Sequence, residues 1–155
     1  MDPRREIGFV VSFVGSITCV LLLAVLVTGC KQPSILMKPE IMRTGGAIDE
    51  STGELKDIRN AFSSDDAQIV AWVSFLQAHG NQTARFKWYN PEDYLVLDSG
   101  PIAISPDNML YEWRSVWSVL PVKNTSAEHM PGRWKVFTYM NNKKIGTLYL
   151  TVDPQ

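Results

Sequence analysis

The stretch PGRWKVFTYMNNKKIGTLYLTV, residues 131–152, decides the fold. In its first half Trp134 and Val136 occupy alternate positions. In its second half an aliphatic residue stands at every other position from Leu148 to Val152, and Asn141-Asn142 separates the two halves. An apolar period of two is typical of a half-buried strand, and a short Asn-containing turn between two such runs is typical of a hairpin. The stretch therefore predicts two antiparallel strands joined by a tight turn.

The same alternation extends upstream to residue 67, with turn chemistry between the runs. Candidate strands occupy residues 67–76, 85–89, 94–97 and 109–122, although residues 65–76 also fit a short helix. Turns are expected at residues 49–54, where Gly53 suits a positive φ, and at residues 90–93. The inward faces are expected to carry Ile69, Ala71, Val73 and Phe75 in the first run and Phe86 and Trp88 in the second, with Arg85 and Lys87 on the opposite face. About seven short strands separated by turns predict an all-β chain that forms an antiparallel β-sandwich.

The closing stretch resembles the final hairpin of immunoglobulin-like domains in bacterial exported proteins, in which Gly-x-Trp-x-Val begins the penultimate strand. The resemblance covers residues 58–153 loosely, concerns the fold and identifies no particular family. It implies that Trp88 is the core tryptophan of the third strand. The chain departs from antibody-type domains because no cysteine pair joins the sheets, so burial must hold the fold together. The side chains expected to supply this burial are Trp72, Phe86, Trp88, Trp134, Val136, Leu148 and Leu150, with Trp113 and Trp117 also expected in the core.

An apolar N-terminal segment indicates where the protein is located. Arg4 and Arg5 precede an uncharged run over residues 7–29, which is long enough to cross a bilayer as a helix. Basic residues before an apolar run are typical of an export signal that keeps its start in the cytoplasm. The segment is therefore either a signal peptide or a permanent transmembrane anchor.

The end of this run favours the signal peptide. Val27-Thr28-Gly29-Cys30 resembles the bacterial lipobox: an aliphatic residue, a small residue, Gly or Ala, and then cysteine. The resemblance implies that Cys30 receives a diacylglycerol, that cleavage follows Gly29, and that the new amino group of Cys30 is acylated. Lys31 after the cysteine resembles an outer-membrane sorting context. The alternative is that Cys30 is a thiol at the end of a retained helix.

These patterns divide the chain into three parts. Residues 1–29 form the signal peptide or apolar helix, residues 30–57 a lipidated tether and edge segment, and residues 58–155 the immunoglobulin-like β-sandwich domain. The tether assignment rests on the two prolines and the Gly-Gly pair of residues 31–47.

Composition and motifs disfavour catalysis and nucleic-acid binding. Fifteen Lys and Arg against sixteen Asp and Glu leave a net charge of -1, without the basic excess that phosphate binding needs. His79 and His129 lie in turn-like segments without a second ligand at metal-binding spacing, and Asp65-Asp66 fits a turn better than an acid–base pair. No Gly-x-Ser-x-Gly elbow or glycine-rich nucleotide loop is present. We therefore expect no enzyme activity, no metal, no nucleotide and no cofactor beyond the lipid on Cys30.

One feature fits a contact surface. If Trp134, Val136 and Thr138 face the core, Phe137 and Tyr139 face outward, and Tyr149 lies beside them on the neighbouring strand, with Lys135 and Thr147 at the margin. Outward aromatic residues on one sheet face suit contact with a protein or a sugar. The alternative is that the tether or an extra strand covers these rings.

The sequence thus predicts a lipid-anchored, non-catalytic binding or scaffolding protein of the bacterial cell envelope. It would face the periplasm or the exterior, with the outer membrane favoured, and would serve an envelope protein complex as an accessory subunit. Two alternatives remain open: a single-pass transmembrane subunit with an uncleaved helix, and an envelope carbohydrate-binding module or enzyme accessory domain.

Overall fold

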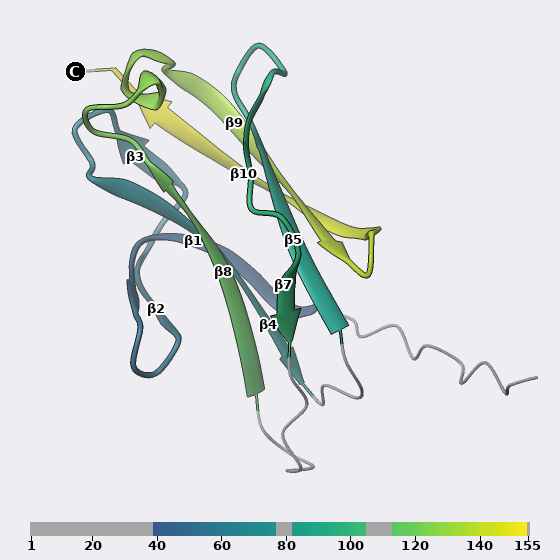
Figure 1. Cartoon of the computed structure of the whole chain (residues 1–155). Helices are drawn as coiled ribbons and strands as arrows, with labels where there is room; N and C mark the ends of the chain where they lie inside the picture. Colours follow the sequence, from purple (N-terminus) through teal and green to yellow (C-terminus); the bar gives the residue numbers. More distant parts are fainter. Residues whose placement is uncertain (1–38, 77–81, 105–112, 155) are drawn as a thin grey trace, which may run out of the picture. The chain divides into compact units, whose positions relative to one another are not determined.

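The chain forms two β-sheets in the residues that the structure, a computed structural model, describes: 39–76, 82–104 and 113–154 (Figure 1). The first sheet has the strand order β2 (Glu54–Ile58), β1 (Pro39–Asp49), β4 (Gln68–Leu76) and β8 (Trp113–Pro121). The second has the order β3 (Ala61–Ser63), β10 (Lys143–Asp153), β9 (Gly132–Met140), β5 (Gln82–Tyr89) and β6 (Leu95–Asp98), with β7 (Ile102–Ile104) also paired to β5. A short 3-10 helix, η2 (Ser126–His129), precedes β9. The prediction of an all-β fold is confirmed for these ranges, whereas the predicted N-terminal helix lies outside them.

Strand pairing in both sheets is antiparallel, except that β3 runs parallel to β10. β5 pairs with β9 along one edge, while β6 and β7 share its other edge one after the other. Figure 1 shows β9 and β10 running side by side as one long hairpin. This hairpin and β5 form the centre of the second sheet and present its outer face.

The core lies between the two sheets and follows the predicted alternation. Burial alternates residue by residue along β5 and again along β9 from Arg133 to Met140. Trp88 and Trp134 are both fully buried, and the Trp88 indole N–H donates to Ser118 Oγ on β8 at 3.0 Å. Large fully buried side chains come from both sheets, and they include Phe62, Ile69, Val73, Phe75, Phe86, Trp88, Trp134, Val136, Met140 and Leu150.

Two of the predicted turns have the expected backbone geometry. Asn141 and Asn142 have φ values of 48° and 65°, and a tight hairpin turn with both central residues at positive φ matches the twist of the strands it joins. Gly53 has φ of 70°, and its N–H donates to the carbonyl of Asp49 at 2.7 Å. At the third turn, the side-chain oxygen of Asn90 accepts from the backbone N–H of Tyr94 at 2.8 Å.

β1 and β2 lie within the segment that the sequence assigned to tether and edge, residues 30–57. β1 pairs with β4 from Pro39 to Gly45 and with β2 from Gly45 to Asp49. The glycines that suggested a loop stand where the strands approach closely, because a Cβ on Gly45 would lie 2.5 Å from the carbonyl oxygen of Lys56. Pro39–Asp49 and Glu54–Ile58 therefore belong to the first sheet.

Three predictions for individual segments need correction. Trp72 and Trp117 were expected in the core, but both are half-buried cross-strand neighbours on the outer face of the first sheet. The inner face of β4 is taken by alternate residues from Ile69 to Phe75, so Trp72 must point outward, where its indole N–H donates to the Gly53 carbonyl at 2.8 Å.

Leu148 is half-buried and packs against the core from its margin. Residues 68–76 form a strand, so the helical alternative is wrong. The side chain of Trp113 is not among those that the structure describes.

Candidate functional site

The predicted lipid-attachment site, Cys30 with Val27, Thr28 and Gly29, lies outside the described residues, as does the apolar run before it. Within residues 39–76, 82–104 and 113–154, no helix has the length and apolar character to span a bilayer. The candidate site that the structure does describe is the outer face of the second sheet.

The three aromatic residues singled out in the sequence occupy this outer face. Phe137 and Tyr139 alternate along β9 with the fully buried Val136 and Thr138, so their rings point away from the core. Tyr149 lies on β10 directly opposite Lys135 and is 52% exposed. Phe137 stands opposite Thr147, two residues from Tyr149, so the two rings are diagonal neighbours across the hairpin. A fourth ring joins them from β5, since Tyr89 lies 4.9 Å from Phe137 between ring centroids.

Cationic side chains of the same sheet lie over these rings. The Lys144 ammonium is 3.4 Å from the centroid of Phe137, and the Arg133 guanidinium is 4.4 Å from that of Tyr149. Longer contacts join Lys87 to Tyr139 at 5.7 Å and Lys135 to Phe137 at 5.8 Å. A cation over a ring face is attracted by the negative charge of the π-system. The face is therefore made of aromatic rings overlaid by positive charge.

Carboxylates neutralise the cations on the β5–β6 side of this face. Arg85 donates twice to Asp98, from Nε at 2.6 Å and from Nη2 at 2.5 Å, and Lys87 approaches the same carboxylate at 3.8 Å. Hydrogen bonding from Arg85 lowers the pKa of Asp98, with smaller contributions in the same direction from the Gly100 N–H and Lys87. Lys135 forms an ion pair with Asp93.

Two cations on the β9–β10 side differ from these. Among the described residues, neither Arg133 nor Lys144 forms an ion pair with a carboxylate. Both are exposed, and each has an aromatic ring as its neighbour. Their N–H groups are therefore available to an external acceptor.

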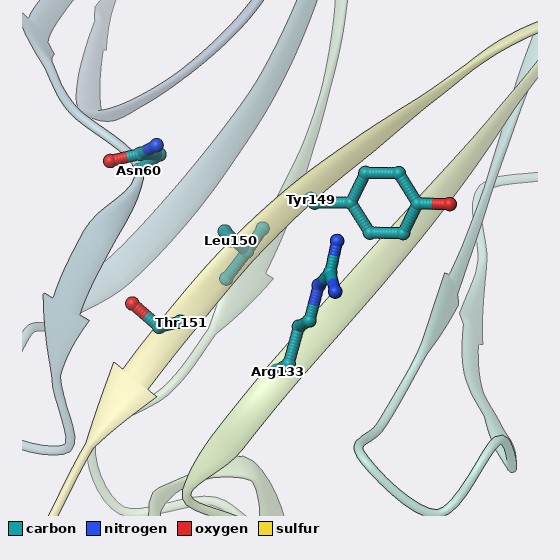
Figure 2. A pocket seen from close by; sticks show the side chains of 5 residues that line it. All are labelled: Asn60, Arg133, Tyr149, Leu150 and Thr151. Carbon is teal, nitrogen blue, oxygen red and sulfur yellow. The ribbon is translucent and has the colours of Figure 1, made fainter.

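A shallow depression of about 230 Å³ opens beside Arg133. Figure 2 shows its lining: the Arg133 guanidinium lies against the Tyr149 ring, and Asn60 and Thr151 lie at the other end of the depression. The Thr151 N–H donates to the Asn60 carbonyl at 2.8 Å, which holds the segment before β3 against β10. Guanidinium, amide and hydroxyl groups around one hollow can donate hydrogen bonds to a carboxylate or a similar small anion.

The sequence contained a signal for part of this surface. Arg133 has the same strand parity as Lys135, Phe137 and Tyr139, so alternation alone places it outward, although it was not among the predicted contacts. Lys144 follows the hairpin turn, and the local sequence does not predict that its ammonium lies over the ring of Phe137. Asn60 carries no local signal either, since only the parallel pairing of β3 with β10 brings it to the depression.

The described residues contain no group of three or more His, Cys, Asp or Glu side chains placed to hold a metal. His129 is exposed at the end of η2, and His79 lies outside the description. Asp66, considered in the sequence as half of an acid–base pair, accepts hydrogen bonds from Arg59 and from the Ser63 N–H, each at 2.7 Å, and thus caps a turn.

Comparison with known proteins connects the chain to others by fold alone. No protein-family model matches the chain, and no curated protein sequence does. Its structure is similar to that of the alkylpurine DNA glycosylase AlkC of Pseudomonas fluorescens bound to DNA containing an abasic site analogue, with a TM-score of 0.50 and 8% identity over 76% of this chain. The chain spans 30% of the length of that glycosylase.

Two further solved structures have lower scores. An immunoglobulin-like protein from Pseudomonas aeruginosa has a TM-score of 0.44 and 6% identity, over 75% of this chain and 95% of the other. A Niemann-Pick type C2 protein from the Japanese carpenter ant has a TM-score of 0.37 and 9% identity, over 77% of this chain and 92% of the other.

Proposed function

We propose that this protein is a lipid-anchored, non-catalytic binding or scaffolding protein of the bacterial cell envelope, built on an immunoglobulin-like sandwich. The observation that carries the binding role is the outer face of the second sheet, where four aromatic rings gather and cationic side chains lie over three of them. Tyrosine and arginine are enriched at the energetic centres of protein interfaces.

The strand order supports the immunoglobulin-like assignment. In such domains strands B and E pair in one sheet, C, F and G pair in the other, and a buried tryptophan stands on strand C. Here β4 pairs with β8, and β5, β9 and β10 are neighbours in that order, so they correspond to B, E, C, F and G. Trp88 on β5 then occupies the position of the core tryptophan of strand C, and its hydrogen bond to Ser118 on β8 links the two sheets.

The anchoring part of the proposal is supported by the sequence. Basic residues, an apolar run and Val27-Thr28-Gly29-Cys30 follow one another in the order that a lipoprotein signal requires. Acyl chains contribute about 0.8 kcal/mol per buried CH₂, so two or three chains on Cys30 would hold the domain at a membrane. The segment between Cys30 and Pro39 would then act as the tether.

The binding role is tested by changing Tyr139 and Tyr149 together to Ala in the tagged full-length protein. Proteins that co-purify from detergent-solubilised native membranes are compared for this variant, for the unchanged chain and for Ile58→Ala. Ile58 is 54% exposed on β2 of the other sheet and serves as the matched control. We expect the double variant to lose specific partners that the control retains, with the same circular dichroism spectrum. Unchanged co-purification in the folded double variant would show that this face is not the contact surface.

A further inference from the structure

Among the described residues, the two cations of the β9–β10 outer face without a carboxylate partner lie over two neighbouring rings. Arg133 leans over Tyr149 and Lys144 leans over Phe137. Since these two rings are diagonal neighbours across an antiparallel pair, their Cα atoms are about 7–8 Å apart. Alternate side chains of an extended peptide are about 7 Å apart and point to the same side. The two residues whose rings carry the cations are thus about as far apart as alternate side chains of one extended segment.

The cations also make neutral sugar a poor occupant of this face. Sugars bind aromatic side chains by stacking on their open ring faces, and here Lys144 and Arg133 already lie over the rings of Phe137 and Tyr149. A ligand that approaches these two rings meets the N–H donors of Arg133 and Lys144, which lie over the ring faces. Such donors form their strongest hydrogen bonds with carboxylates and other anions.

Charges around the face restrict where an acidic ligand lies. Asp98 and Asp93 occupy the β5–β6 side and already neutralise Arg85 and Lys135. Asp153, exposed at the end of β10, bounds the other end of the hairpin beyond Thr151. Among the described residues, no Asp or Glu stands on β9 and β10 between Arg133 and Lys144. The depression with Asn60 and Thr151 adjoins it at the Arg133 end (Figure 2).

We propose that the outer face of β9 and β10 between Arg133 and Lys144, the β9–β10 track, binds an extended acidic segment of a partner protein. Arg133 and Lys144 each bind one carboxylate, and the side chains of Asn60 and Thr151 donate further hydrogen bonds to the carboxylate at Arg133. This inference rests on the proposed function, because it assigns the chemistry of the partner to the same contact surface. Glutamate or aspartate at alternate positions is the pattern that the track fits.

The test uses the full-length chain in a non-ionic detergent and a fluorescent peptide of alternating Glu and Thr, followed by fluorescence anisotropy at low salt. The comparison peptide replaces each Glu by Gln. We expect Arg133→Ala with Lys144→Ala to weaken binding of the Glu peptide about tenfold or more, since hydrogen bonds to charged groups are lost. Arg43→Ala with Lys56→Ala removes one Arg and one Lys from the other sheet and serves as the matched control. The control is expected to bind within about twofold of the unchanged chain, because removing surface cations away from the track takes away only long-range attraction.

Several outcomes would overturn the inference. Equal binding of the Gln peptide would show that the ligand need not be acidic. Unchanged binding by the folded variant with Arg133→Ala and Lys144→Ala would show that the peptide does not bind at the β9–β10 track. Tighter binding of polygalacturonate than of the peptide, with the same sensitivity to the two substitutions, would make the ligand an acidic polysaccharide. Displacement of the peptide by phosphatidylglycerol in the micelles would make it a lipid surface. If the peptide assay fails while Tyr139→Ala with Tyr149→Ala still abolishes co-purification, the contact surface stands and only the acidic partner is wrong.

Discussion

The indole of Trp88 is fully buried between the sheets, and its N–H has Ser118 Oγ as its acceptor on the facing sheet. Ser118→Ala should leave that donor unpaired and lower the free energy of unfolding by about 1–3 kcal/mol. In a Trp88→Phe background, where no N–H needs a partner, the same change should cost much less. Urea unfolding of the four proteins of this double-mutant cycle measures the difference. An equal cost of Ser118→Ala in both backgrounds would contradict the role given to this hydrogen bond.

Asp98 gives the stability a dependence on pH. Hydrogen bonding from Arg85 lowers its pKa in the folded state, so the folded protein binds fewer protons here than the unfolded chain. The stabilisation is therefore present above the unfolded pKa of about 3.9 and is lost as pH falls through the lower folded value. The melting temperature should fall less between pH 6 and pH 3 in Asp98→Asn than in the unchanged chain, and Arg85→Gln should reproduce that reduction. A full-sized fall in both variants would assign the acid sensitivity to other carboxylates.

At the level of secondary structure, the β9–β10 hairpin depends on a turn that few residues can form. Asn142 has φ of 65°, a left-handed conformation that costs a residue with a Cβ roughly 1–2 kcal/mol and that asparagine tolerates better than alanine does. Asn142→Ala should therefore lower the free energy of unfolding by about 1 kcal/mol. Asn142→Gly should be neutral or stabilising, since glycine adopts positive φ freely. Denaturant unfolding of both variants makes the comparison, and an equal loss in both would point to the side chain rather than the backbone.

A strand could be predicted from the sequence where alternating apolar residues mark its buried face. β4, β5, β9 and β10 carry alternating apolar residues because one face of each packs on the core, and these strands were located from the sequence. β1 and most of β2 fell in the segment assigned to tether and edge, because the two prolines and the pair Gly45-Gly46 of residues 31–47 are typical of loops. In the folded chain Gly45 is required by the close approach of β2, a tertiary reason that the local sequence does not report.

Trp72 shows a conflict between residue type and position. Its hydrophobicity placed it in the core, whereas the alternation of β4 placed it outside, and the alternation was the better guide. The turn at Gly53 supplies an acceptor for its indole N–H from a hairpin far away in the sequence. Such a partner becomes visible only when strand order is known.

At the level of the whole molecule, the candidate surface was predictable in part. Alternation located Phe137, Tyr139 and Tyr149 on one outward face, since this needs only the strand assignment and the hairpin register. The cations over the rings, and the arrival of Asn60 beside Thr151, depend on long-range pairing and on side-chain directions. The sequence therefore predicted an aromatic patch, whereas the folded surface is aromatic and cationic together.

The proposed attachment of this domain to a membrane can be tested at Cys30. If Val27-Thr28-Gly29-Cys30 is a lipobox, protein extracted from its native membrane should have the mass of residues 30–155 plus its acyl chains. Cys30→Ala removes the thiol that takes the lipid, so the acyl mass should vanish and the leader should stay uncleaved. Intact-mass spectrometry of both proteins, each purified in detergent, makes the measurement. A mass of the full chain without lipid in the unchanged protein would make residues 7–29 a permanent helix. The outer face of the second sheet would then serve a complex that also contacts this helix inside the bilayer.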